Sequence, residues 1–101
     1  MTFRVLSPAD DEIAEATTWY SQDQQSPQSA ERFLEEVETA YKAIRRDPNR
    51  YPKRSHGFRE WPLRKYPFRV LYTIEPDEII VSSVKHNDRD SGYLERLKYG
   101  T

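Results

Sequence analysis

REWPLRKYPFRVLYTIEPDEIIVSSVKHNDRDSGY, residues 59–93, is the stretch of the chain that decides its fold. From Phe68 to Ile74 apolar side chains recur at alternate positions, and β-branched and aromatic residues dominate, which predicts a half-buried strand. Residues 79–84 predict a second strand. The residues between them, Glu75-Pro76-Asp77-Glu78, are typical of a turn, because proline presets φ and the aspartate can bond nearby backbone. The pattern therefore predicts an antiparallel hairpin.

A turn of two or four residues gives this hairpin a single register. The predicted cross-strand pairs, which form its core face, are Ile74 with Ile79, Tyr72 with Val81, and Val70 with Ser83. Arg69 and His86 then share the opposite face with Leu71, Ser82 and Val84. We therefore expect the guanidinium of Arg69 and the imidazole of His86 to lie close together at the open end of the hairpin.

Two helices are predicted before the hairpin. Each begins with a serine that caps the helix, followed by a proline at the first helical position. Ser7-Pro8 follows a short apolar run at residues 3–6 that predicts a strand, and Ser26-Pro27 repeats the signal. The first helix has an apolar stripe at Ala9, Ile13, Ala16 and Tyr20, with Asp11, Glu12 and Glu15 toward solvent. The second has its stripe at Ala30, Phe33, Leu34, Val37, Tyr41 and Ile44.

The predicted order of elements is strand, helix, helix, strand, strand, strand, with a short C-terminal tail. Residues 58–63 predict the strand before the hairpin, at a sheet edge because of Pro62. The fold class is α+β: a small, mostly antiparallel sheet with the two helices packed on one face. We expect residues 1–101 to form a single domain.

Composition narrows the possible functions of the chain. There is no cysteine, which excludes disulfides and thiolate metal sites, and no apolar run approaches the length of a membrane span. We therefore expect a cytoplasmic protein without a membrane partner. The net charge of −1 conceals an asymmetry: residues 1–47 hold ten acidic and five basic side chains, and residues 48–101 hold seven and eleven.

The basic charge gathers between Arg50 and Arg69, where Glu60 is the only acidic residue. Such a segment attracts a phosphate backbone or an acidic protein segment. Interleaved aromatic residues favour stacking on bases, although Phe58 and Trp61 also suit the core. The alternative is a solvated basic edge that only discourages aggregation. The candidate RNA- or partner-binding residues are Arg59, Arg64, Lys65 and Arg89.

Four sequence features occur in a fixed order along nearly the whole chain. They are a first helix ending in Trp19-Tyr20; a second with Phe33-Leu34, followed by Pro48 and Tyr51-Pro52; the strand Phe68-Arg69-Val70-Leu71-Tyr72; and the ending Val84-Lys85-His86-Asn87-Asp88-Arg89 with Tyr93 and Arg96. Together they resemble the RelE/ParE superfamily of toxins from bacterial type II toxin–antitoxin systems, the plasmid stabilisation type. The resemblance implies a growth inhibitor held inactive in a complex with a cognate antitoxin.

The two branches of this superfamily imply different activities. RelE-like members cut messenger RNA on the ribosome without a metal or cofactor, whereas ParE-like members poison DNA gyrase. For cleavage the resemblance implies Arg69 as the phosphate ligand and Tyr93 as a stacking or proton-transfer residue. His86 is the candidate proton carrier, because a histidine side chain can give or take a proton near neutral pH. Each also has another interpretation: Arg69 as a partner-binding residue, His86 as a hydrogen-bonded strand end, and Tyr93 as packing for the tail.

Two departures from the RelE-like pattern favour the ParE-like branch. The lysine pair of RelE-like enzymes falls on Glu60 and Pro62, and a further catalytic arginine falls on Asn87. Glu60 as a general base is a further hypothesis. The sequence thus predicts a gyrase inhibitor, with a ribosome-dependent endoribonuclease as the alternative.

Overall fold

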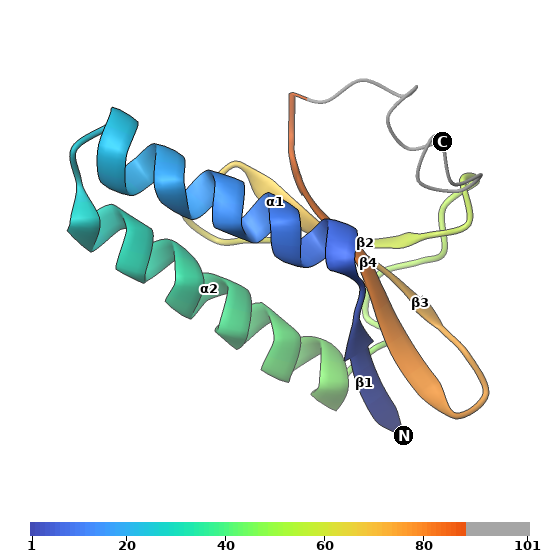
Figure 1. The fold of residues 1–101 in the computed structure, drawn as a ribbon. Helices are drawn as coiled ribbons and strands as arrows, with labels where there is room; N and C mark the ends of the chain where they lie inside the picture. Colours follow the sequence, from blue (N-terminus) through green and yellow to red (C-terminus); the bar gives the residue numbers. More distant parts are fainter. Residues whose placement is uncertain (89–101) are drawn as a thin grey trace.

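The structure is a computed structural model that describes residues 1–88 and confirms the predicted order of elements within them (Figure 1). The elements are β1 (Thr2–Val5), α1 (Ser7–Thr18), the π-helical turn η1 (Trp19–Asp23), α2 (Pro27–Arg46), β2 (Arg59–Pro62), β3 (Phe68–Ile74) and β4 (Glu78–His86). The strands form one sheet in the order β1-β4-β3-β2. β1 runs parallel to β4, and the other pairs are antiparallel.

The helices begin differently from one another. At α2 the side chain of Ser26 accepts a hydrogen bond from the backbone N–H of Ser29 at 3.3 Å, which confirms the predicted cap. The prediction for Ser7 was wrong, because Ser7 is already helical and the extended residue before it, Leu6, takes the cap position without a side-chain bond. α1 ends at Thr18, before the predicted stripe residue Tyr20, and the helical chain continues as the π-helical turn η1 to Asp23.

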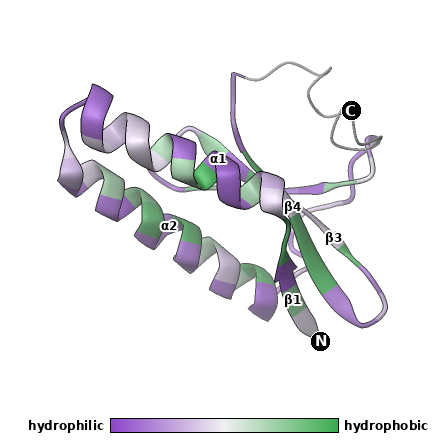
Figure 2. Ribbon diagram, viewed as in Figure 1, coloured by the Kyte–Doolittle hydropathy of each residue, from purple (hydrophilic) through white to green (hydrophobic). Residues whose placement is uncertain are grey.

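Both helices pack their apolar stripes on one face of the sheet, where Phe33, Ile44, Val70 and Tyr72 are completely buried. Figure 2 shows hydrophobic and hydrophilic positions alternating along α2, as expected for a helix with one buried side. Leu34 was wrongly predicted to be buried: it is 40% exposed, and Ala40 is buried in the stripe instead. α2 is nonetheless held mainly by this packing, since each large buried side chain contributes about 1.5–3 kcal/mol.

α1 closes the edge of β4 where β1 ends. The last β1 pair is Val5 with Val81, and Leu6 N–H then donates to Val81 O at 2.9 Å. Beyond this point Glu12 Oε1 accepts hydrogen bonds from Ser83 Oγ at 2.7 Å and from Val84 N–H at 3.3 Å. Glu12 was therefore wrongly predicted to face solvent, because its carboxylate bonds the edge of β4 beyond the last pair with β1.

The hairpin of β3 and β4 contains a β-bulge. Ile74 pairs with Ile79 and Tyr72 with Val81, as predicted, but Leu71 then pairs with Ser83. Ser82 is thus an extra residue in β4, and Val70 pairs with Val84 rather than with Ser83. The bulge brings Val84, 1% exposed, onto the core face, whereas the predicted register had placed it on the opposite face. Every residue of β4 after the bulge changes face with it.

Within residues 1–88, no helix is both long and apolar enough to span a membrane.

Candidate functional site

Arg69 and His86 lie on opposite faces of the hairpin. Downstream of the bulge, His86 pairs with Phe68, while Arg69 pairs with Lys85. The rings of Phe68 and His86 are 5.0 Å apart and nearly perpendicular, so they share one face. Arg69 alternates to the other face, where it meets residues of β2. The prediction that the guanidinium and the imidazole lie close together was therefore wrong, and Ser82 is the reason.

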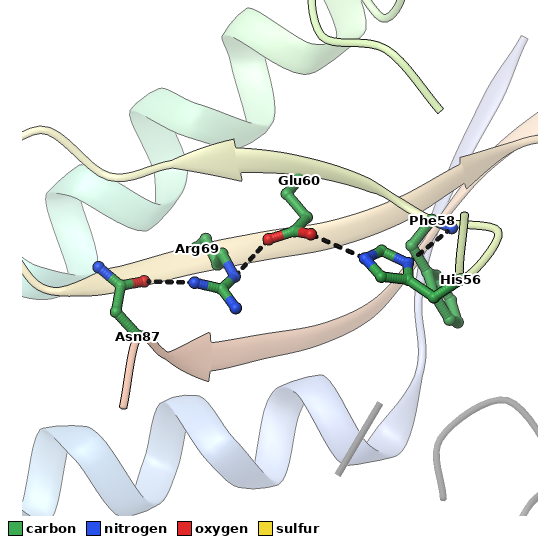
Figure 3. A network of polar contacts seen from close by, with 5 residues as sticks. All are labelled: His56, Phe58, Glu60, Arg69 and Asn87. Atoms are coloured by element: carbon green, nitrogen blue, oxygen red, sulfur yellow. Dashed lines mark hydrogen bonds and ion pairs between the residues drawn. The ribbon is translucent and has the colours of Figure 1, made fainter. Parts of the chain in front are cut away.

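The Arg69 side of the sheet carries a chain of polar contacts (Figure 3). Arg69 Nε lies 2.5 Å from Glu60 Oε1 in an ion pair, and its Nη1 donates to Asn87 Oδ1 at 3.3 Å. The second carboxylate oxygen of Glu60 lies 2.8 Å from His56 Nε2. Glu60 thus joins Arg69 of β3 to a histidine in the loop before β2. We call His56, Glu60, Arg69 and Asn87 the polar network.

The loop before β2 determines the tautomer of His56. The backbone N–H of Phe58 donates to His56 Nδ1 at 3.2 Å, so a neutral ring carries its proton on Nε2 and donates it to Glu60. Gly57 N–H donates to Arg54 O at 2.9 Å and closes the turn. Gly57 has φ of +95°, a conformation that other residues rarely adopt, and this allows the chain to bring His56 toward β2.

The surroundings of Glu60 favour its ionised form. Burial by itself raises the pKa of the carboxyl group, but the hydrogen bond from His56 and the charge of Arg69 outweigh it, so the pKa is lowered from 4.5. A carboxylate of lowered pKa is a weak general base at neutral pH. It also neutralises Arg69, whose side chain is only 25% exposed. Neither residue of this pair is arranged as a free catalytic group.

The basic residues predicted to bind RNA or a partner differ in their exposure. The guanidinium of Arg59 bonds within the protein, because its Nη1 donates to Tyr51 O at 2.6 Å. Arg64 and Lys65 are exposed in the loop between β2 and β3. The backbone N–H groups of these two residues donate to Glu36 Oε1 of α2 at 3.0 and 3.1 Å, which fixes the loop against the helix.

His86 faces a groove beside α1. The groove has a volume of about 910 Å³ and is lined by α1, η1, the end of β4 and Phe68. His86 Nδ1 accepts a hydrogen bond from Asp88 N–H at 3.1 Å, so it is held at the rim.

Two predicted site residues, Tyr93 and Arg89, lie outside the described residues. His56 was missing from the sequence-based set, because its contact with Glu60 depends on the turn at Gly57 and leaves no spacing signal. No group of three or more His, Asp or Glu side chains that could hold a metal ion occurs in residues 1–88.

Comparisons with known proteins agree with this fold. A family model described as the ParE toxin of the type II toxin–antitoxin system, parDE, matches residues 3–91. Among solved structures, the chain is similar to one from the chromosomal ParDE TA system of P. aeruginosa, with a TM-score of 0.74 and 17% sequence identity. That match covers 85% of this chain and 95% of the other. No match was found among curated protein sequences.

Proposed function

Because the chain belongs to the ParE toxin family of type II toxin–antitoxin systems, we propose that it inhibits DNA gyrase and that a cognate antitoxin neutralises it. The family model extends over residues 3–91, which include every described helix and strand except Thr2, the first residue of β1. Gyrase works on chromosomal DNA, so the proposed place of action is the cytoplasm. In the neutralised state the toxin and antitoxin form a hetero-oligomer.

The ion pair between Arg69 and Glu60 is the observation that most favours this target over messenger RNA. Metal-independent RNA cleavage requires cations free to bind the phosphate and a proton carrier beside them. In the described residues the charge of Arg69 is already neutralised by Glu60, whose Oε1 lies 2.5 Å from Arg69 Nε. His86 lies on the other face of the hairpin. This separation supports a toxin that acts by binding rather than by cutting.

The exposed loop of Arg64 and Lys65 is the proposed contact with gyrase. Both side chains are exposed, and their backbone is already held by Glu36. The loop backbone therefore loses little conformational entropy when it binds. Arg69 lies at the adjoining end of β3, and we assign it a positioning role, because its guanidinium bonds to Glu60 and Asn87. Arg89 is the remaining proposed binding residue.

A bacterial strain that expresses the chain with and without its antitoxin tests this proposal. We expect growth arrest accompanied by induction of a DNA-damage reporter, while a defined messenger stays intact by primer extension. Antitoxin expression should restore growth. His86→Ala should remain toxic, since its side chain lies on the face away from Arg69. Messenger cuts that appear with arrest and vanish in Arg69→Ala would instead establish the endoribonuclease.

A further inference from the structure

Two aromatic rings and an arginine meet at β2, which is an edge strand of the sheet. The ring of Trp61 lies 5.0 Å from that of Tyr51, edge to face, and both side chains are partly exposed. The guanidinium carbon of Arg50 lies 5.9 Å from the centroid of each ring, within reach of a cation–π contact. We call Arg50, Tyr51 and Trp61 the aromatic platform.

The aromatic platform and the polar network lie on opposite faces of β2. Successive side chains of a strand point to opposite faces, so Trp61 and its neighbour Glu60 are separated by the strand. Trp61 pairs with Val70 and packs against the core under the helices, whereas Glu60 bonds to Arg69 on the other side. The platform is therefore not part of the Arg69 site.

Further basic side chains lie beside the platform. The guanidinium of Arg59 is next to Tyr51, because its Nη1 donates to Tyr51 O. Arg59 also borders a cavity of about 290 Å³, whose lining consists of Lys53, Gly57, Arg59, Thr73, Ile74 and Glu75. Two cations against one carboxylate leave this lining net positive. Arg50 and Lys53 are exposed, and neither forms an ion pair within residues 1–88.

The loop that carries these residues is held by hydrogen bonds at both ends. Pro48 O accepts from the hydroxyl of Tyr72 in β3 at 2.8 Å, and Arg54 N–H donates to Phe58 O at 2.9 Å. The loop is thus already ordered, so a ligand that binds it pays little for fixing its backbone.

The edge of β2 presents side chains rather than backbone donors to a ligand. Leu63 N–H donates to Phe68 O at 3.0 Å, so odd-numbered residues of this strand bond toward β3 and even-numbered ones point outward. The outward position 62 is a proline, which has no N–H. Addition of a partner strand is therefore disfavoured here.

We propose that the aromatic platform binds single-stranded DNA, with a base stacked on the rings and the adjoining phosphates against Arg50, Lys53 and Arg59. Stacking on aromatic side chains tolerates any base, and a basic border follows the phosphate backbone. DNA is the nucleic acid on which gyrase works, so the choice of DNA rests on the proposed function. The surface itself is separate from the Arg64 and Lys65 loop.

Fluorescence anisotropy on the full-length protein, without gyrase, tests this proposal. The probe is a fluorescein-labelled thymidine oligomer of about 12 nucleotides. We expect it to bind, and to bind roughly tenfold more weakly at about 200 mM than at about 50 mM salt, as for two or three neutralised phosphates. An abasic oligomer of the same length and charge cannot stack and should bind about tenfold more weakly or worse.

Substitutions separate stacking from charge. Trp61→Leu keeps an apolar side chain against the core and should weaken binding by about tenfold. Arg50→Gln combined with Lys53→Gln should weaken it by a similar factor. Arg32→Gln combined with Lys42→Gln makes the same change of net charge at exposed positions of α2 and should bind within about twofold of the unaltered protein. Circular dichroism checks the fold of each variant.

Tryptophan fluorescence reports the stacking itself. The chain has two tryptophans, so Trp19→Phe leaves Trp61 as the only one. In this variant we expect the thymidine oligomer to quench the emission of Trp61 and the abasic oligomer to leave it unchanged. The comparison of the two oligomers needs no substitution at Trp61, so it decides the role of stacking even if Trp61→Leu misfolds.

Four results would overturn the proposal. They are failure of the thymidine oligomer to bind folded protein, equal binding of the abasic oligomer, equal weakening by the α2 variant, and binding of a uridine oligomer at least tenfold tighter than that of the thymidine oligomer. The last result would assign the platform to RNA. Because the assay contains no gyrase, these results do not depend on whether the protein inhibits that enzyme.

Discussion

Phe68 and His86 are cross-strand partners in the β3–β4 hairpin, with ring centroids 5.0 Å apart. This pairing turns His86 toward the groove beside α1 and leaves Arg69 on the face of the polar network. The molecule therefore presents two surfaces of different character. One is the exposed loop of Arg64 and Lys65, and the other is the groove beside α1, whose described lining includes the carboxylates of Asp11, Glu15 and Asp88.

Deletion of Ser82 tests the structural role of the bulge. Without the extra residue, Val81 and Val84 are two positions apart, so a regular ladder keeps Ser83 opposite Leu71 and Val84 opposite Val70. Val84 stays in the core, and we expect the free energy of unfolding to change by less than about 1 kcal/mol. Urea denaturation measures this change. Ser82→Ala keeps the residue count and should cost less than about 0.5 kcal/mol. A deletion variant that is several kcal/mol less stable than Ser82→Ala would show that Ser83 and Val84 do not keep these partners without the bulge.

Glu60→Gln tests the polar network through pH. The pKa of Glu60 is lowered in the folded protein, so its stabilising effect is fully present above its ordinary pKa of 4.5 and is lost as pH falls through the lower, folded-state pKa. We expect the variant to lose about 1–3 kcal/mol at neutral pH and to show a flatter decline of stability in acid. Urea denaturation across pH measures both effects.

Glu31, exposed on α2, provides the control for this experiment. Glu31→Gln should leave both the stability and its pH dependence unchanged. If Glu60→Gln declined in acid as steeply as the unaltered protein, the carboxylate of Glu60 would not be the group that the fold keeps ionised.

Glu12→Ala tests how α1 is attached to the sheet. Removing the carboxylate takes this acceptor from Ser83 Oγ and Val84 N–H, at the edge of β4 beyond its last pair with β1. Leaving buried donors without their acceptor costs about 1–3 kcal/mol, and amide exchange at Val84 should quicken. Glu15→Ala, one turn further on at an exposed position, should change stability by less than about 0.5 kcal/mol. Equal losses in the two variants would contradict this assignment.

Arg64→Ala combined with Lys65→Ala tests the proposed gyrase contact. The two side chains are exposed, so we expect the fold to be unaffected while toxicity falls by about tenfold or more, counted as surviving colonies. Arg32→Ala with Lys42→Ala removes the same charge from exposed positions of α2 and should stay fully toxic. Full toxicity of the loop variant would exclude this loop as the contact.

Much of the fold follows from local patterns. Alternation from Phe68 to Ile74 and the Pro76 turn predict the hairpin, and the helical spacing of Phe33, Val37 and Ile44 predicts the buried side of α2. These signals succeed because apolar burial dominates the energy of both elements.

The site was harder to predict, because one residue of β4 changes its geometry. Apolar residues on the core face occur at Ile79, Val81 and Val84, and the interval of three between the last two is the only local trace of the bulge. The contacts of His56 with Glu60 and of Glu12 with Ser83 join distant segments. They depend on a turn and on a sheet edge that only the tertiary fold creates.

The most direct test of the account is a supercoiling assay with purified gyrase, relaxed plasmid and antitoxin-free protein. We expect loss of supercoiling that adding the antitoxin restores, that persists in His86→Ala and that weakens in the Arg64 and Lys65 variant. Normal supercoiling at every concentration of folded protein, together with cleavage of a messenger on stalled ribosomes, would contradict the proposed target.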